Sequence, residues 1–119
     1  MLTVYIYQKC STCRDALKWL DAHEICYQTK AIRETPPTAD ELKIALDALG
    51  GELRKLFNSS GMDYRALGLK DLLPTLSEAD AIALLSQNGN LVKRPFLLGD
   101  GHVLVGFKPE IWKTDLVVD

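Results

Sequence analysis

The strongest constraint on the fold lies in residues 1–32, where two apolar runs flank a helical stripe that begins beside a pair of cysteines. Residues 2–7, LTVYIY, are rich in branched and aromatic side chains, which predicts a strand covered on both faces. Residues 25–32 predict a second strand. Between them, apolar side chains recur at the spacing of an amphipathic helix, at Cys13, Ala16, Leu17 and Leu20. Strand, helix and strand within about 30 residues form a βαβ unit.

Capping and turn residues divide the middle of the chain. A double proline ends the βαβ unit, and Thr38 and Glu41 then have the spacing of a capping box at the start of a helix. That helix is expected to stop at the glycine pair 50–51. Ser77 is placed to cap a further helix, which Gly89 is expected to close. The pattern predicts a largely helical middle.

The last third changes from helical to strand patterns. Two short apolar runs in residues 94–107 surround a Gly-Asp-Gly turn, which predicts a hairpin. Pro109 can occupy the first position of a final helix. The expected order is therefore βαβ, a helical block over about residues 38–90, and ββα. This is an α/β architecture, and a length of 119 residues predicts a single domain, 1–119.

Composition restricts the partners and the compartment. The chain is 47% apolar and 25% charged, as is ordinary for soluble globular proteins, and its net charge is -2. That balance predicts neither nucleic-acid binding nor attachment to an anionic membrane. No apolar run reaches the roughly 20 residues that span a bilayer. The N-terminal residues lack the pattern of a secretory signal, so we expect a reducing cytoplasmic location, where cysteines are more often catalytic, metal-binding or inert than structural disulfides.

Zinc binding is the first alternative for the cysteines. Cys10, Cys13, His23 and Cys26 together supply four ligands of the two types, thiolate and imidazole, that zinc binds. However, a helix over residues 13–23 would separate His23 from Cys13 by roughly 15 Å, whereas zinc ligands must converge on one ion. The spacing therefore argues against a metal site, and His23 is expected to be a solvated residue at the helix end.

A redox pair fits the same residues better. Cys10 is expected at the helix N-terminus, where free N–H groups and nearby Lys9 and Arg14 would stabilise a thiolate. Cys13 belongs to the buried stripe. We therefore expect Cys10 to be an exposed nucleophile and Cys13 a shielded resolving thiol, with an inert pair of thiols as the alternative. Cys26, inside the second predicted strand, is expected to be buried and inert.

Three segments carry a resemblance that covers almost the whole chain. Residues 7–25, 56–71 and 90–112 resemble, in order and spacing, the arsenate reductase and Spx family of thioredoxin-like proteins. The combination of segments is specific, although each one alone would be weak. The resemblance implies a thioredoxin-like, four-stranded mixed sheet with a helical insert between its βαβ and ββα halves.

The resemblance also implies a site. Cys10 matches the family's catalytic cysteine, and Arg94 with Pro95 matches an arginine–proline pair in which the proline is usually cis and the arginine faces the active site. A helix start can cradle an anion with backbone N–H groups, and a guanidinium can bind an oxyanion through two parallel hydrogen bonds. The expected catalytic residues are Cys10, Cys13 and Arg94, and the expected substrate-binding residues are Ser11, Thr12, Arg14, Asn58, Pro95 and Lys108.

Two differences from the family's arsenate reductases leave two functions open for this chain. The family's arsenate reductases surround the oxyanion with three arginines, whereas here Asn58 and Lys108 stand at two of those positions. Those enzymes usually lack a cysteine at position 13 and depend on glutathione and glutaredoxin. The C-x-x-C form is similar to Spx-type proteins, which use the pair as a redox switch and bind the C-terminal domain of the α-subunit of RNA polymerase.

The leading hypothesis is a thiol-dependent, arsenate-reductase-like oxidoreductase that acts on an oxyanion or a disulfide through Cys10 and Cys13. Thioredoxin is the expected reductant, with glutaredoxin and glutathione as the alternative. No pattern for a metal, flavin or nucleotide site is present, so no cofactor is expected. The second hypothesis is a redox-sensing transcriptional regulator that binds the α-subunit of the polymerase.

Overall fold

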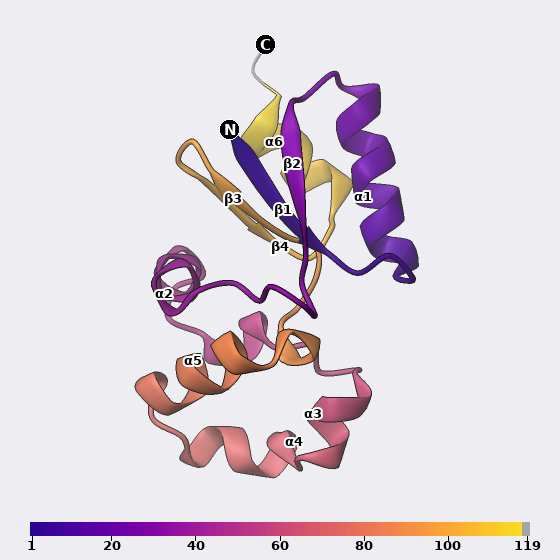
Figure 1. Ribbon diagram of the computed structural model, residues 1–119. Coiled ribbons are helices and arrows are strands. Elements are labelled where there is room, and N and C mark those ends of the chain that lie inside the picture. Colours follow the sequence, from indigo (N-terminus) through magenta and orange to yellow (C-terminus); the bar gives the residue numbers. More distant parts are fainter. Residues whose placement is uncertain (118–119) are drawn as a thin grey trace.

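A four-stranded mixed sheet organises the N- and C-terminal parts of the chain. The computed structural model describes residues 1–117. The strands are β1 (Leu2–Ile6), β2 (Tyr27–Ala31), β3 (Phe96–Gly99) and β4 (His102–Val105), in the spatial order β2-β1-β3-β4. β1 runs parallel to β2 and antiparallel to β3, and β3 pairs antiparallel with β4 (Figure 1). The predicted thioredoxin-like α/β fold is therefore confirmed.

The helices follow the predicted order. α1 (Ser11–Ala22) connects β1 to β2, and α6 (Pro109–Leu116) follows β4. The elements between β2 and β3 are helical, and they lie below the sheet in Figure 1. They are α2 (Ala39–Ala48), a 3₁₀ helix (Leu53–Leu56), α3 (Met62–Ala66), α4 (Leu69–Leu72), a 3₁₀ helix (Leu73–Thr75), α5 (Glu78–Gln87) and a 3₁₀ helix (Gly89–Leu91). Across residues 1–117, no helix is long and apolar enough to cross a membrane.

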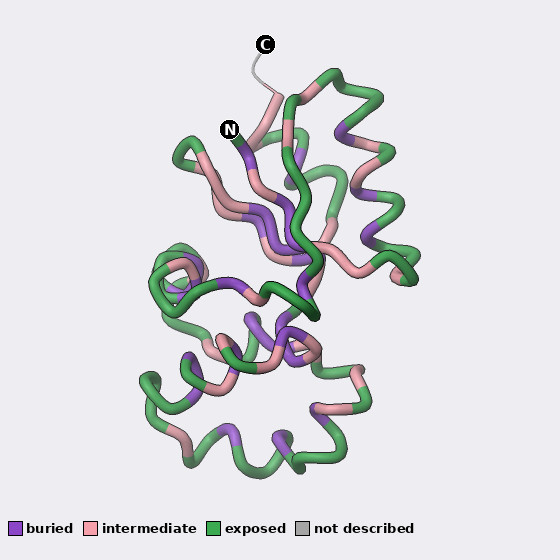
Figure 2. Tube along the Cα trace, viewed as in Figure 1, coloured by how far each residue is buried: buried purple, intermediate pink, exposed green. Residues whose placement is uncertain are grey.

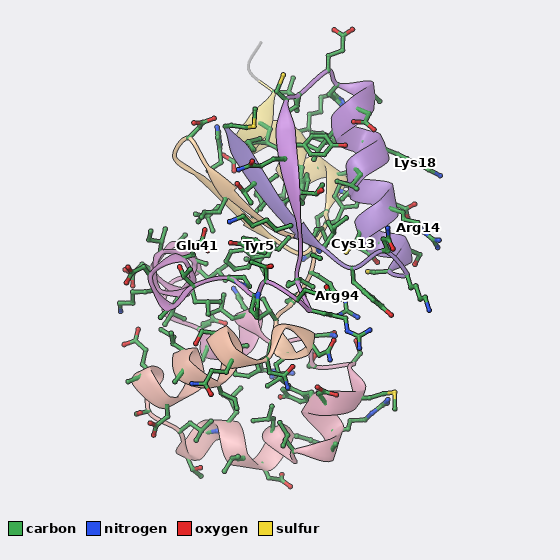
Figure 3. The ribbon with its side chains drawn as sticks, in the orientation of Figure 1. Tyr5, Cys13, Arg14, Lys18, Glu41 and Arg94 are labelled. Carbon is green, nitrogen blue, oxygen red and sulfur yellow. The ribbon has the colours of Figure 1, made fainter. Side chains whose placement is uncertain are left out.

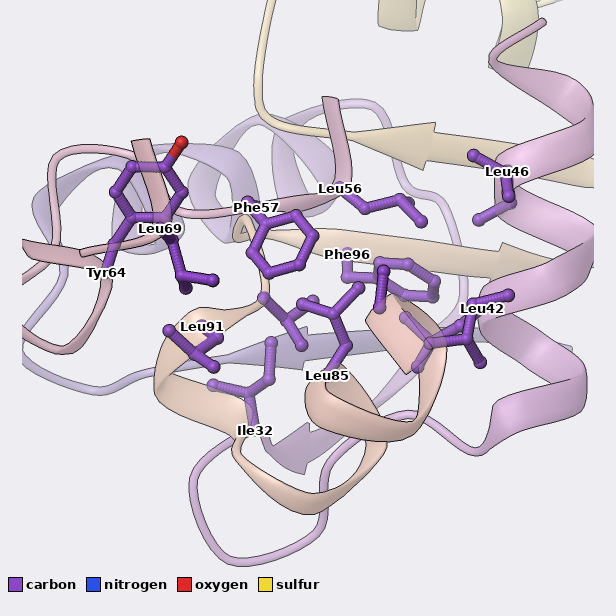
Figure 4. Close-up of a cluster of buried hydrophobic side chains, with 14 of the residues drawn as sticks. Ile32, Leu42, Leu46, Leu56, Phe57, Tyr64, Leu69, Leu85, Leu91 and Phe96 are labelled. Atoms are coloured by element: carbon purple, nitrogen blue, oxygen red, sulfur yellow. The ribbon is translucent and has the colours of Figure 1, made fainter. Parts of the chain in front are cut away.

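Each face of the sheet belongs to a different hydrophobic core, because neighbouring side chains along a strand point to opposite faces. Val4 and its partner Leu97 pack with Ala16, Leu20 and Trp112, so α1 and α6 cover one face. Tyr5 and its partner Phe96 face the opposite core, which contains side chains of α2 and α5 (Figure 4). The strands at the centre of the sheet are thus buried on both sides, as predicted for β1 (Figure 2).

The predicted helix caps and the predicted hairpin are both present. Thr38 Oγ1 accepts a hydrogen bond from the Glu41 N–H at 3.2 Å, and Glu41 Oε1 accepts one from the Thr38 N–H at 3.0 Å, which completes the capping box of α2. Ser77 caps α5. In the β3–β4 hairpin, Asp100 and Gly101 have φ angles of 51° and 82°, as a two-residue type I′ turn requires.

Two expectations about individual residues are wrong. β2 begins at Tyr27 rather than at residue 25, and Cys26 before it is exposed instead of buried. The reason is that β2 is an edge strand with a neighbouring strand on one side only, and its residues 28–31 are all exposed (Figure 2).

Gly89 has a different role from the predicted one. α5 ends at Gln87 with Asn88 as its cap, before Gly89 is reached. A Cβ atom on Gly89 would lie 1.7 Å from the carbonyl oxygen of Ile32, so glycine is required because two backbone segments approach closely. α3 and α4, with five and four residues, were not predicted, since such short helices show no helical periodicity in sequence.

A first prediction concerns the contact between the sheet and α2. The buried Tyr5 hydroxyl donates a 2.6 Å hydrogen bond to Glu41 Oε1, and the two side chains lie close together in Figure 3. Burial and this carboxylate raise the pKa of Tyr5 far above its ordinary value. We expect Tyr5→Phe to lower the free energy of unfolding by about 1.5–3 kcal/mol, as for a hydrogen bond to a charged group. Chemical denaturation measures this change.

Tyr64→Phe is the matched control, because Tyr64 is also buried but its hydroxyl has no hydrogen-bond partner within residues 1–117. We expect this substitution to change the stability little. Equal losses from Tyr5→Phe and Tyr64→Phe would show that the contact with Glu41 is not stabilising.

Candidate active site

Cys10 lies where β1 passes into α1. It is the N-cap of the helix and is half-buried, and its N–H donates to the Tyr7 carbonyl at 3.0 Å. The Cys13 N–H donates to Cys10 Sγ at 3.4 Å. Cys13 itself is fully buried on the inner face of α1. The predicted arrangement, with one accessible and one buried sulfur at the helix start, is therefore present.

The pKa values of the two thiols are shifted in opposite directions. Partial burial raises the pKa of Cys10, but the Cys13 N–H, the Cys13 thiol and the Arg94 guanidinium together lower it below its ordinary value. Burial raises the pKa of Cys13 to about 12, and a thiolate at Cys10 acts in the same direction. At neutral pH Cys10 is therefore the better nucleophile. The charged side chain that favours its thiolate is Arg94, rather than the neighbouring Lys9 and Arg14 that the sequence indicated.

Arg94 reaches the cysteine through pairing between two distant segments. Phe57 and Val92 form an isolated antiparallel bridge, and the Lys93 N–H donates to the Leu56 carbonyl at 2.8 Å. The next residue is Arg94, and the Arg94–Pro95 peptide bond is cis, as the family resemblance implied. The same pairing places Asn58, whose N–H donates to the Leu91 carbonyl at 2.7 Å, beside the arginine segment.

The surface around Cys10 is hollowed into a pocket of about 430 Å³, the cysteine pocket. Four segments that are far apart in the sequence line it. The lining residues are Cys10, Thr12, Asn58, Ser60, Gly61, Lys93, Arg94, Val105, Gly106, Phe107 and Lys108. The pocket therefore combines a thiol of lowered pKa with three cationic side chains, a composition suited to binding an anion.

Five of the nine residues singled out from the sequence line this pocket, and four do not: Cys13 is buried beneath Cys10 on the inner face of α1, and the other three lie elsewhere. Ser11 and Arg14 are exposed on the first turn of α1, and Pro95 is buried. Sequence reasoning missed Lys93 and the turn residues Ser60 and Gly61. The position of Lys93 next to Arg94 could have indicated it, whereas the two turn residues reach the pocket only through the Phe57–Val92 pairing.

Tyr7 is a further neighbour of the arginine. The Arg94 guanidinium carbon lies 5.0 Å from the centre of the Tyr7 ring, and that of Arg33 lies 4.9 Å from it. Such cation–π contacts contribute about 0.5–1 kcal/mol at exposed positions. The ring therefore helps to orient Arg94 toward Cys10.

Asn58 is held by a network of amides. Its Nδ2 donates to the Asn90 carbonyl at 3.5 Å, and the side chains of Asn88 and Asn90 both donate to Asp63 Oδ2. A Cβ atom on Gly61 would lie 2.7 Å from Asn58 Nδ2, so the turn packs tightly against this side chain. The segment between β2 and β3 thus contributes part of the wall of the cysteine pocket, through the turn that contains Asn58 and Gly61.

The pKa difference gives a second prediction. We expect iodoacetamide to alkylate Cys10 much faster than Cys13 at neutral pH, because only the thiolate reacts and Cys13 is also buried. The Cys10 rate should fall only below a midpoint that lies under the ordinary thiol pKa of about 8.5. Peptide mapping by mass spectrometry at graded pH measures both rates, and the exposed Cys26 is the internal reference for access. Faster labelling of Cys13 would overturn these assignments.

Known proteins are similar to this chain in sequence and in fold. The ArsC family profile matches residues 5–114. Uncharacterized protein YusI of Bacillus subtilis is 45% identical over 109 residues, which cover 92% of each chain. The global transcriptional regulator Spx of Enterococcus faecalis is 31% identical over 117 residues, covering 92% of this chain and 82% of Spx.

A solved structure gives the same result for the three-dimensional fold. The crystal structure of a possible arsenate reductase from Streptococcus mutans UA159 matches with a TM-score of 0.85 and 46% identity, covering 91% of this chain and 92% of the other. The resemblance noted from the sequence is thereby confirmed at both levels. With nearly its whole length matched by the family profile, the chain belongs to the ArsC family.

Proposed function

We propose that this protein is a thiol-dependent oxidoreductase in which Cys10 attacks an oxidised substrate held in the cysteine pocket. The observation that carries the proposal is the convergence of Cys10, with its lowered pKa, and Arg94, Asn58 and Lys108 on one pocket. Arg94 would bind an anionic group of the substrate as well as the thiolate. Membership of the ArsC family, whose members include arsenate reductases and Spx regulators, supports this chemistry.

For a disulfide substrate, two exchange steps complete the reduction. The Cys10 thiolate attacks one sulfur, the substrate S–S bond breaks, and one substrate thiolate leaves while a mixed disulfide forms. The Cys13 thiol loses its proton, attacks Cys10 Sγ and releases the second substrate thiolate. A Cys10–Cys13 disulfide remains, and an external dithiol, which we propose to be thioredoxin, returns it to the reduced state. A reducing cytoplasm would support this cycle.

For arsenate, the same residues would carry out a reduction of As(V) to As(III). The Cys10 thiolate would displace a hydroxyl group, which leaves as water after protonation, and form an S–As bond. Attack by Cys13 on Cys10 Sγ would break that bond, leave its electron pair on arsenic and release arsenite. The two electrons come from the thiols, which end as a disulfide. Asn58 and Lys108 replace two of the arginines implied by the family resemblance, so we expect slow turnover of arsenate.

This expectation is a third prediction. The double variant Asn58→Arg/Lys108→Arg should raise kcat/KM for arsenate by roughly one to four orders of magnitude, because each restored charge-assisted hydrogen bond contributes about 1.5–3 kcal/mol and Lys108 already supplies part of that. Steady-state kinetics with thioredoxin as reductant measures it. Lys18→Arg on the exposed face of α1 is the control for added guanidinium groups. Fast arsenate turnover by the natural chain would contradict the expectation.

A redox-sensing regulator is the second candidate, favoured by the 31% identity with Spx of Enterococcus faecalis. In this case oxidation of Cys10 and Cys13 would alter the affinity for the C-terminal domain of the α-subunit of RNA polymerase instead of completing a catalytic cycle. The redox pair is common to both proposals. What distinguishes them is whether the oxidised pair is formed repeatedly with substrate or persists as a signal.

One experiment separates the two candidates. Reduced protein is incubated with arsenate and with a panel of low-molecular-weight disulfides, and mass spectrometry follows the Cys10–Cys13 pair while product is measured with thioredoxin and with glutaredoxin. Multiple turnovers support the oxidoreductase. Oxidation without turnover would support the regulator and exclude the enzymatic proposal if the protein also binds the purified C-terminal domain of the polymerase α-subunit in a redox-dependent way.

A further inference from the structure

A second cavity, of about 950 Å³, lies among the helical elements between β2 and β3 and contains no cysteine. Its walls come from the 3₁₀ helix Leu53–Leu56, α3, α4 and the 3₁₀ helix Leu73–Thr75. One short turn separates it from the cysteine pocket, because Ser59 lines this cavity while Asn58 and Ser60 line the other. The cavity volume is within the range typical of small-molecule sites.

The inner wall of this cavity is apolar. Tyr64 and Leu73 are buried, and Leu53 and Leu76 are half-buried. Tyr64 packs edge-on against Phe57 with ring centres 6.1 Å apart, and its hydroxyl has no hydrogen-bond partner within residues 1–117. This wall can therefore receive an apolar group and offers one free hydroxyl beside it.

The rim of the cavity is cationic. Arg54, Arg65 and Lys70 are exposed lining residues, and Asp71 is the one acidic lining residue. Among residues 1–117, none of these three cations forms an ion pair. Lys55, next to Arg54, is by contrast paired with Glu52 at 3.6 Å. Unpaired positive charge around an apolar wall is complementary to a molecule with an apolar body and an anionic head.

We propose that this second cavity binds a small amphiphilic anion, of which a medium-chain carboxylate is the simplest representative. The chain of the ligand contacts Leu53, Leu73 and Leu76, where burial of apolar area is favourable. Its carboxylate lies among the rim cations. The site uses no residue of the cysteine pocket, so it is distinct from the proposed oxidoreductase function and does not depend on it.

Binding of octanoate to the full chain tests the proposal, with octan-1-ol as the probe of equal chain length without the charge. We expect the backbone amide shifts in NMR titrations to concentrate in residues 53–54 and 64–76. Octanoate should bind about fivefold more tightly than octan-1-ol, and Arg65→Gln or Lys70→Gln should each weaken octanoate binding about two- to fivefold, the range of exposed ion pairs. Octan-1-ol binding should not respond to either substitution.

Two matched variants distinguish this cavity from the rest of the surface. Lys18→Gln removes an exposed positive charge on α1, and Arg94→Gln removes the arginine of the cysteine pocket. Both should leave octanoate binding unchanged. The proposal is overturned if octanoate does not bind, if the alcohol binds as tightly as the carboxylate, or if Arg94→Gln abolishes binding while Arg65→Gln and Lys70→Gln preserve it.

Discussion

Cys10→Ser is expected to reduce turnover of any oxidised substrate by about three orders of magnitude or more, because removal of a catalytic nucleophile commonly costs at least this much. A serine hydroxyl at the same N-cap can still accept the Cys13 N–H, so the helix start should be preserved. The lost quantity is the thiolate that Arg94 and the helix start stabilise. Initial rates with thioredoxin as reductant, compared at equal protein concentration, measure the effect.

The other two cysteines provide the internal comparisons. Cys13→Ser should still form the mixed disulfide at Cys10 but should release the second product slowly, so the mixed disulfide accumulates and is detected by mass spectrometry. Cys26→Ser, at an exposed position outside the pocket, should retain full activity. Activity that survives in Cys10→Ser, or that disappears in Cys26→Ser, would refute the proposed nucleophile.

Trp112→Ala is expected to lower the free energy of unfolding by about 3–5 kcal/mol, the range for truncation of a buried aromatic side chain. Trp112 on α6 is 1% exposed and packs edge-on against Trp19 and Phe107, with ring centres 5.9 and 4.9 Å away. Its Nε1–H donates to the Gly106 carbonyl at 3.0 Å. One side chain thus joins α6, α1 and the loop that contributes Gly106 to the cysteine pocket.

Two milder substitutions separate packing from hydrogen bonding at this position. Trp112→Phe keeps an aromatic ring but leaves the Gly106 carbonyl without its donor, so we expect a loss of about 1–3 kcal/mol. Ile111→Ala on the same helix is the control, because Ile111 is 52% exposed and should matter little. Urea denaturation of the variants measures the series. A loss from Ile111→Ala as large as that from Trp112→Ala would show that burial of the Trp112 ring does not account for the effect, because alanine itself favours the helix.

Features that depend on a few neighbouring residues could be predicted from the sequence. The βαβ unit followed from apolar spacing, and the α2 capping box and the β3–β4 hairpin followed from residue types at short separation. The division between Cys10 and Cys13 was also local, because a helix start and a buried stripe three residues later place one sulfur outside and the other inside. Short-range geometry alone sets these properties.

Features that depend on distant segments were decided by the tertiary structure. Neighbouring residues indicated Lys9 and Arg14 as the cations beside Cys10, and only the family resemblance indicated Arg94; the Phe57–Val92 pairing brings that guanidinium to Cys10 from 84 positions away along the chain. Cys26 became exposed because β2 lies at the sheet edge, which depends on strand order and not on the residues of the strand. Spacing within a segment determines which side chains share a face. Only the pairing of remote segments determines which residues pack against that face.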